Sequence, residues 1–237
     1  MTAHTEGEAS YLSMQRAWYD TNAEQSAYMP GVVMRDQIVG NFAAHEEFPY
    51  ESWLFRHYTP CATHLCFEYG CGPGRQIRRL IPHFRRVDGV DISQGNILNA
   101  RAYLGANYDG ILVENDGTNV PLQDEYDFCY SIICLQHIPV YDIRRKILTN
   151  MRDRLSPGGS ICVQLAMGSS TSGTPTFAYR DNFYGATETN GKMDCRVDNE
   201  DEVREDFSDL GFVQVNTAVS ETVCDHHPAW LWVYGVK

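Results

Sequence analysis

The fold of this chain is decided by one stretch, Cys66-Phe67-Glu68-Tyr69-Gly70-Cys71-Gly72-Pro73-Gly74-Arg75. An apolar run over 64–69 ends in glycines at alternate positions, and an amphipathic segment over 75–84 follows. This order predicts a buried strand, a tight turn and the start of a helix. Because glycine adopts positive φ angles and leaves backbone N–H groups accessible, we expect the turn to bind a ligand.

The composition indicates one globular protein of ordinary polarity. The chain has 237 residues, 43% of them hydrophobic, which is enough for one large core with a small additional part. The net charge is 19 − 31 = −12, and no long basic run interrupts the acidic surface. Since proteins that bind nucleic acid need a basic face, we predict no nucleic-acid partner.

The cysteines indicate a reducing compartment. There are eight, but none forms a C-x-x-C pair, and several lie in apolar, strand-like runs where a free thiol packs as a small hydrophobe. The first residues are polar and acidic, and no apolar run reaches about 18 residues. We therefore expect a cytoplasmic protein without a membrane partner.

The first quarter of the chain reads as helical. We expect disorder over 1–9, helices over about 9–25 and 33–45 separated by a turn at Pro30-Gly31, and a short segment over 53–58. Residues 1–59 are thus predicted to form a helical cap on a larger domain over 60–237.

From residue 60 onward, strands alternate with helices. The predicted strands cover 64–69, 86–92, 110–113, 126–131 and 160–166, and the predicted helices cover 75–84, 94–104, 140–155 and 198–210. This alternation predicts a parallel sheet with helices on both faces. Two last strands, over 213–219 and 229–236, are joined by a loop so short that they must pair antiparallel. The irregular but aromatic stretch over about 167–192 is predicted to be an ordered or closing lid.

The glycine spacing excludes two common phosphate sites. A dinucleotide turn has the pattern G-x-G-x-x-G, but Arg75 occupies the position of its last glycine. A P-loop needs a lysine after its glycines, and none follows here.

The same stretch resembles motif I of the class I S-adenosylmethionine-dependent methyltransferases, as Glu68-x-Gly70-x-Gly72-x-Gly74. The resemblance extends over most of residues 60–237 and is carried by further motifs in the expected order: Gly89-Val90-Asp91-Ile92-Ser93, Asn115-Asp116-Gly117, Tyr126-Asp127-Phe128, Leu135-Gln136-His137-Ile138-Pro139 and Leu155-Ser156-Pro157-Gly158-Gly159. It implies a Rossmann-like α/β fold with a seven-stranded, mostly parallel sheet whose last strand is antiparallel. It also implies S-adenosyl-L-methionine as the cofactor.

The resemblance assigns cofactor contacts to particular residues. Asp91 closes the second strand and is expected to accept hydrogen bonds from the ribose hydroxyls, as in dinucleotide sites. Asp116 would accept from the adenine amino group with the Gly117 backbone nearby, and Ile92 would pack on the adenine. Asp-Gly is also a common turn dipeptide, which is the alternative for this pair. The methionine portion would be surrounded by Glu68, Gly70 and the carbonyl of Ser131, and Gly72 and Gly74 of the same turn are also expected to bind the cofactor.

The acceptor is expected at the same edge, because ligands of open parallel sheets lie beyond the carboxyl ends of the strands. Histidine can remove a proton from a hydroxyl near neutral pH. We predict His137 as the first candidate for the base and His226 or His227 as the second, with Asp225 as an orienting partner. A structural His137 and a solvated His226-His227 loop are the alternatives. These side chains could also hold a divalent metal, but their spacing requires none, and we predict no metal site. Tyr11, Trp18, Tyr19 and Tyr28 are candidates for the roof of the acceptor pocket.

The sequence therefore predicts an enzyme that methylates a small molecule, at oxygen, with histidine as general base. Methylation of a small amine, or of a peptide or protein, is the alternative within the same class. A catalytically silent partner subunit that only binds the cofactor is the alternative of another class. A homodimer is compatible with the sequence.

Overall fold

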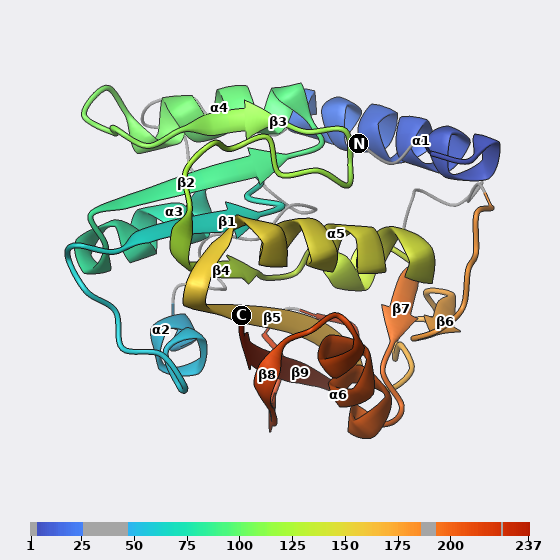
Figure 1. Ribbon diagram of the computed structural model, residues 1–237. Coiled ribbons are helices and arrows are strands. Elements are labelled where there is room, and N and C mark those ends of the chain that lie inside the picture. The colour runs from blue at the N-terminus through green and yellow to red at the C-terminus, as the bar shows by residue number, and fades with distance from the viewer. Residues whose placement is uncertain (1–3, 26–46, 186–192, 224) are drawn as a thin grey trace.

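A twisted seven-stranded sheet with helices on both faces forms the centre of the protein (Figure 1). The computed structural model describes residues 4–25, 47–185, 193–223 and 225–237. The sheet is made of β1 (Leu65–Tyr69), β2 (Arg86–Asp91), β3 (Leu112–Glu114), β4 (Tyr126–Ser131), β5 (Leu155–Met167), β8 (Val213–Ser220) and β9 (Ala229–Val236). The helices are α1 (Glu6–Gln25), α2 (Tyr50–Leu54), α3 (Arg75–Leu80), α4 (Gln94–Leu104), α5 (Tyr141–Arg154) and α6 (Glu200–Asp209), with 3-10 turns η1 (Ile81–His83) and η2 (Leu135–His137).

The strand order is β3-β2-β1-β4-β5-β9-β8. Strands β1 to β5 pair in parallel, whereas β9 pairs antiparallel with both β5 and β8. The prediction of a Rossmann-like sheet with an antiparallel last strand is therefore confirmed. The chain order reverses between β1 and β4, and this switch opens a crevice at the carboxyl ends of these strands.

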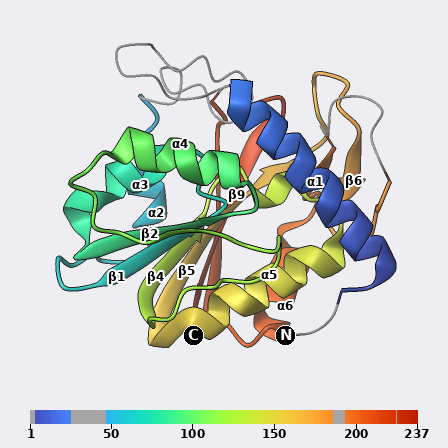
Figure 2. The same cartoon turned by 90° about the horizontal axis from the view of Figure 1, so that it is seen from above.

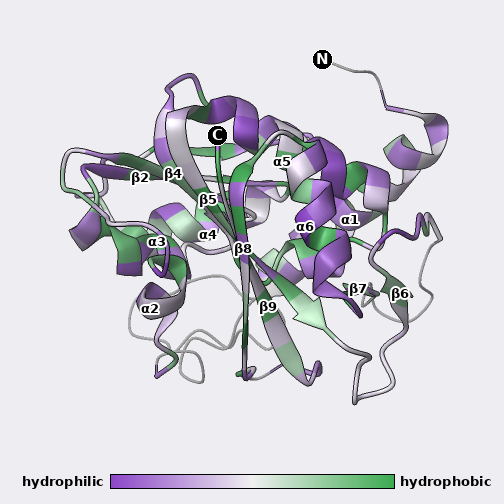
Figure 3. Cartoon of the chain, turned by 60° about the horizontal axis from the view of Figure 1, so that its bottom comes forward, coloured by the Kyte–Doolittle hydropathy of each residue, from purple (hydrophilic) through white to green (hydrophobic). Residues whose placement is uncertain are grey.

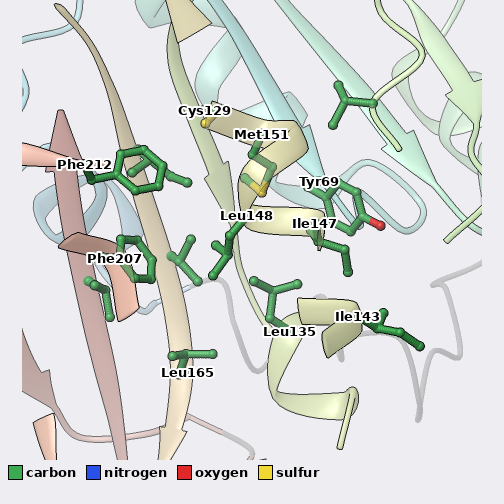
Figure 4. Close-up of a cluster of buried hydrophobic side chains, with 14 of the residues drawn as sticks. Tyr69, Cys129, Leu135, Ile143, Ile147, Leu148, Met151, Leu165, Phe207 and Phe212 are labelled. Carbon is green, nitrogen blue, oxygen red and sulfur yellow. The ribbon is translucent and has the colours of Figure 1, made fainter. Parts of the chain in front are cut away.

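The sheet is apolar on both faces, which is why its strands read as continuous hydrophobic runs. Neighbouring residues of one strand point to opposite faces. Phe67 belongs to the core under α5 and α6, and the adjacent Cys66 belongs to the core under α2, α3 and α4. Figure 4 shows the first of these cores, where Ile147 and Met151 of α5 pack beside Tyr69 and Cys129. Helix α6 is mostly hydrophilic (purple in Figure 3), but its Val203 and Phe207 are fully buried.

A second, two-stranded sheet lies at the carboxyl edge of the main one. It pairs β6 (Thr176–Ala178) in parallel with β7 (Asp194–Arg196). The described part of the predicted lid is thus ordered: Phe177 stacks on Phe183 with ring centroids 4.2 Å apart, and Tyr179 is buried. Among the described helices, none combines the length and the apolar composition that a membrane span requires.

The N-terminal quarter differs from its prediction at the start of α1. Disorder over 1–9 is wrong for its second half, because α1 begins at Glu6 with a capping box. The Thr5 amide donates to a Glu8 carboxylate oxygen (2.8 Å), and the Glu8 amide donates to the Thr5 hydroxyl (3.3 Å). The helix predicted over 33–45 lies outside the described residues.

The α1 helix lies across the carboxyl edge of the sheet, beside α4 near its C-terminus and beside α5 near its N-terminus (Figure 2). On the α5 side, Lys146 donates to both carboxylate oxygens of Glu8, at 2.6 and 2.8 Å. Burial alone would raise the pKa of Glu8, but the Lys146 ammonium and the Thr5 hydrogen bonds hold it below the ordinary value of 4.5. The ionised form of Glu8 is therefore favoured by the folded state.

We predict that Glu8→Gln lowers the free energy of unfolding by about 1–2 kcal/mol at pH 7, since a charge-assisted hydrogen bond is lost. A carboxyl group whose pKa falls on folding stabilises the protein above its unfolded pKa, and this contribution disappears as the pH falls through the folded value. The difference between wild type and variant should thus be full at pH 7 and shrink below pH 4.5. Urea unfolding over pH 7 to 3.5 measures it. Glu6→Gln, at an exposed site in the same helical turn, is the control; equal losses in both variants at pH 7 would contradict the prediction.

Candidate active site

The glycine turn after β1 requires glycine at each of its alternate positions. The φ angles are +72° at Gly70, +49° at Gly72 and +86° at Gly74, a region that other residues rarely adopt. A Cβ atom on Gly70 would also lie 2.2 Å from the sulfur of Cys134. The turn therefore brings the end of β1 into direct contact with the segment that follows β4.

The Asp91 carboxylate at the end of β2 is fixed by the same turn. Its Oδ2 accepts from the Gly72 amide (2.8 Å), and its Oδ1 accepts from the Ser93 amide (2.9 Å) and the Asn96 side chain (3.2 Å). Burial raises the pKa of Asp91 above its usual value, and these donors counteract the rise. The carboxylate is thus held in a defined orientation at the carboxyl edge of the sheet.

A cavity with about 600 Å³ of empty space, partly open to solvent, lies at this edge. The ends of β1, β2 and β4 form its floor, which is the topological switch point of the sheet. Its lining residues come from five segments separated in sequence: Tyr11, Leu12, Gln15, Tyr19, Tyr69, Gly70, Gly72, Asp91, Ile92, Asn96, Gly117, Ile133, Cys134 and Ile138.

The predicted cofactor residues divide into two groups. Five of them line the cavity: Gly70, Gly72, Asp91, Ile92 and Gly117. The remaining four lie around it without lining it: Glu68, Gly74, Asp116 and Ser131.

The three side chains of the second group, those of Glu68, Asp116 and Ser131, each have a structural partner. The buried Glu68 accepts from the Tyr130 hydroxyl (3.2 Å), and its pKa is raised by burial against the opposing Arg75 charge. The Ser131 hydroxyl donates to the Tyr69 carbonyl (2.9 Å). The Asp116 Oδ1 accepts from the amides of the next turn, so this carboxylate stabilises the turn that shapes Gly117.

Helix α1 forms one wall of the cavity with Tyr11, Leu12, Gln15 and Tyr19. Two of these, Tyr11 and Tyr19, were among the predicted roof residues; Trp18 packs edge-on against Tyr19 without lining the cavity, and Tyr28 lies outside the described residues. The buried Tyr11 hydroxyl has no hydrogen-bond partner among the described residues. A buried polar group without a partner is rare in proteins, and a ligand in the cavity would satisfy it.

Polar contacts fix α1 over the cavity. The Arg16 guanidinium donates to the carbonyls of Ile92 (3.2 Å) and Asn115 (2.8 Å), directly after β2 and β3. The Asp20 carboxylate accepts from the Ser93 hydroxyl (2.6 Å) and the Gly95 amide (3.2 Å). These contacts were not predicted, because no local sequence signal links residues so far apart.

Cys134 lines the cavity but carries no charge there. Burial, together with the negative charge of Asp91, raises the pKa of its thiol to about 12. The thiol is therefore protonated near neutral pH and offers neither a base nor a strong nucleophile.

The three predicted histidines converge on one carboxylate, that of Asp194 in β7. The Asp194 Oδ1 is 2.7 Å from His137 Nδ1, and its Oδ2 is 2.5 Å from His226 Nε2 and 2.9 Å from His227 Nε2. Asp194 is fully buried, His227 is 2% exposed, and His137 and His226 are half-buried. We refer to these four residues as the Asp194 cluster.

The charges of the Asp194 cluster stabilise each other. Burial alone would raise the pKa of Asp194, but the three histidines hold it well below its usual range. Burial alone would lower the pKa of His227, but Asp194 and the Gly168 carbonyl raise it. The carboxylate is therefore ionised, and it can stabilise positive charge on a neighbouring imidazole.

Asp194 was missed by sequence reasoning, which named Asp225 as the orienting carboxylate. Asp225 lies beside the cluster and has no hydrogen bond to a histidine ring among the described residues. Its carboxylate accepts from Gln136 (3.0 Å) and Trp230 (2.6 Å), and its Oδ1 is 3.6 Å from His226 Nδ1. Asp194 lies in a short strand without any motif. Its partners His137, His226 and His227 are 57, 32 and 33 residues away in sequence. Only the tertiary structure could reveal it.

The Asp194 cluster adjoins the cavity through η2. Cys134 and Ile138 line the cavity, and His137 lies between them in sequence. The Tyr11 phenol connects the two sites as well: burial raises its pKa, and the Asp194 carboxylate raises it further. A molecule in the cavity would thus lie within electrostatic reach of Asp194.

Comparison with known proteins agrees with this architecture. Residues 67–159 match the sequence model of a methyltransferase domain. The matched segment contains the glycine turn, Asp91 and His137. Residues 67–159 therefore carry a methyltransferase domain.

Solved structures of similar fold are distant in sequence. A complex of DhpI with S-adenosylhomocysteine has 17% identity and a TM-score of 0.62, covering 95% of this chain and 96% of that one. Magnesium protoporphyrin IX methyltransferase from Synechocystis PCC 6803 with S-adenosylmethionine bound has 16% identity and a TM-score of 0.62, covering 100% of both chains. A Haemonchus contortus phosphoethanolamine N-methyltransferase has 14% identity and a TM-score of 0.63, covering 92% of this chain and 60% of that one. The sequence has no significant match among curated proteins.

The glycine at position 117 lets α1 approach the methyltransferase cavity. Its φ is +95°, and a Cβ atom there would lie 2.6 Å from Leu12 Cδ2 and 2.9 Å from Ile92 Cδ1. Gly105 has a similar φ of +82° but no atom within 4 Å of the same position. The two glycines therefore separate backbone strain from crowding.

We predict that Gly105→Ala lowers the free energy of unfolding by about 1–3 kcal/mol, because its backbone (φ +82°, ψ 177°) lies in a region that is almost exclusive to glycine. Gly117→Ala should lose about 1–3 kcal/mol more, because the added methyl group overpacks the contact between Leu12 and Ile92. Urea unfolding of both variants measures the difference. Equal losses in the two variants would show that α1 moves aside at no cost in stability. That result would contradict the close packing of Leu12 against position 117.

Proposed function

We propose that this methyltransferase transfers a methyl group from S-adenosylmethionine to a hydroxyl of a small molecule, with His137 as general base. The observation that supports the proposal most is the hydrogen bond between His137 Nδ1 and the buried Asp194 carboxylate at the edge of the cavity (2.7 Å). In acyl-transfer enzymes with a histidine base, a buried carboxylate orients the imidazole in the same way and stabilises its protonated form.

The cavity fits the proposed cofactor. Asp91 presents a fixed carboxylate for the ribose hydroxyls, and Ile92 presents an apolar surface for the adenine. The partnerless Tyr11 hydroxyl offers a further hydrogen bond to a ligand. The solved structures of similar fold with S-adenosylmethionine or S-adenosylhomocysteine bound support the same cofactor. Contacts of Glu68, Gly74, Asp116 and Ser131 with the cofactor rest on the family resemblance.

The chemistry asks little of the protein beyond alignment and proton removal. When bound, the cofactor supplies a methyl group on a positively charged sulfur, which is a good leaving group. Because Nδ1 of His137 donates to Asp194, its Nε2 is the nitrogen that accepts the hydroxyl proton. The Asp194 carboxylate then stabilises the resulting imidazolium.

Two alternatives keep the same cofactor site. Methylation of an amine needs no strong base, so the histidines would only position the acceptor, and one similar structure is named as an N-methyltransferase. Methylation of a peptide or protein would use the same cofactor cavity. The same holds if this chain only binds the cofactor, as a catalytically silent partner subunit. A homodimer and a cytoplasmic location stay predictions from the sequence.

The cofactor proposal predicts that Asp91→Asn weakens S-adenosylhomocysteine binding about 10- to 100-fold, because charge-assisted hydrogen bonds to the ribose are lost. Isothermal titration calorimetry measures this, and thermal unfolding checks that the turn is intact. Asp127→Asn is the control, since Asp127 accepts from the Leu65 amide at the opposite edge of the sheet. Wild-type protein that binds neither S-adenosylmethionine nor its product would refute the cofactor assignment.

The base proposal predicts that His137→Gln lowers kcat about 10²- to 10⁴-fold, the usual contribution of general base catalysis, with S-adenosylhomocysteine affinity unchanged. Phenols, aliphatic alcohols and primary amines are incubated with deuteromethyl-labelled cofactor, and mass spectrometry identifies the methylated atom. His83→Gln is the control, because His83 of η1 packs against Phe55 and does not line the cavity. An unchanged kcat in His137→Gln would remove its role as base, and label found only on amines would favour the N-methylation alternative.

A further inference from the structure

Three ligand atoms of the Asp194 cluster face one another in a way that hydrogen bonding alone explains poorly. Asp194 Oδ2, His226 Nε2 and His227 Nε2 all lie within 4.8 Å of one another. Two imidazole nitrogens are directed at the same carboxylate oxygen, at 2.5 and 2.9 Å. The side chains of Asp194 and His227 have no exposed surface, whereas that of His226 is 23% exposed.

The tautomer of His227 is fixed by its other nitrogen. Its Nδ1 lies 2.9 Å from the Gly168 carbonyl oxygen, which can only accept, so Nδ1 carries the proton. In a neutral imidazole the lone pair of Nε2 then points at the Asp194 carboxylate, which is unfavourable. Either a second proton or a metal cation must lie between these two atoms.

The surroundings match those of metal-bound histidines. Such histidines nearly always donate their second nitrogen to a carbonyl or carboxylate, which orients the ring. His227 has the Gly168 carbonyl in this position, and His226 has the Asp225 carboxylate 3.6 Å from its Nδ1. Asp225 is itself oriented by Gln136 and Trp230.

Little movement is needed to admit an ion. Ligands at about 2.0–2.1 Å from a tetrahedral metal lie roughly 3.3 Å apart. The nitrogens of His226 and His227 are 2.5 and 2.9 Å from Asp194 Oδ2, so side-chain shifts of under about 1 Å would suffice.

We propose that Asp194, His226 and His227 bind a divalent first-row transition metal of the zinc type through Oδ2 and the two Nε2 atoms. Two imidazoles and one carboxylate favour such ions over Mg²⁺, which prefers oxygen ligands. Three protein ligands leave a further coordination position, as in catalytic zinc sites, and His226 is the ligand that reaches solvent. Asp194 Oδ1 remains the partner of His137. This site goes beyond the proposed methyl transfer, since metal binding requires neither cofactor nor acceptor.

The test uses the full chain, without an affinity tag, after treatment with a chelator and removal of the chelator. Calorimetric titration with Zn²⁺ should show one equivalent bound, and Co²⁺ should give visible absorption bands typical of a four- or five-coordinate site. His226→Asn should weaken Zn²⁺ binding at least about 100-fold, and Asp225→Asn about 10- to 100-fold, the usual effect of changing a residue that orients a ligand. His226 is chosen because its half-buried side chain can be replaced with less risk to folding than Asp194 or His227.

His57→Asn is the matched control, because its ring packs on Tyr234 and lies apart from the Asp194 cluster in the structure. Its affinity for Zn²⁺ should equal that of wild type, and Mg²⁺ should not compete. Wild-type protein that binds no Zn²⁺, or Zn²⁺ binding that His226→Asn leaves unchanged, would overturn the metal site. Titration of the same samples with S-adenosylhomocysteine tests the proposed function separately, so each can fail without the other.

Discussion

The proposed acceptor side of this protein depends on the interactions of one buried carboxylate, that of Asp194. A charge removed from water destabilises a protein by several kcal/mol unless close partners compensate it. Here the partners come from η2 and from the loop between β8 and β9, and Asp194 itself comes from β7. Asp194 therefore joins three segments at one point beside the methyltransferase cavity, and the Gln136–Asp225 hydrogen bond between η2 and the loop supports the same arrangement.

The two sides of the candidate site are built by different physical means. On the cofactor side, backbone conformation decides the geometry: glycines with positive φ expose amide groups, and Asp91 is bound by one of them. On the acceptor side, side-chain charges decide it, through Asp194 and its histidines. Backbone geometry of the first kind recurs as a short local motif, whereas the second kind requires residues from distant segments.

This difference explains how much the sequence could predict. The glycine turn, the order of strands and helices and the reversed β9 follow from local patterns and connection lengths, and the structure agrees. The start of α1 differs from the predicted disorder, because the Thr5–Glu8 capping box is a local signal that outweighs the polar, acidic composition of the terminus. Asp194 and the contacts of Arg16 and Asp20 with the ends of β2 and β3 bring together residues more than thirty positions apart, and no pattern in the sequence marks such pairs.

The arrangement of α1 has a consequence for how this protein could diverge. The residues that attach the helix, Glu8, Arg16 and Asp20, follow one row of i, i+4 spacing, which also contains Leu12. The other three residues that line the cavity, Tyr11, Gln15 and Tyr19, follow the adjacent row. Substitutions in the second row change the shape and polarity of the cavity while the attachment of the helix is preserved. Selectivity for new ligands can therefore evolve in one helix, α1, while the central sheet stays the same.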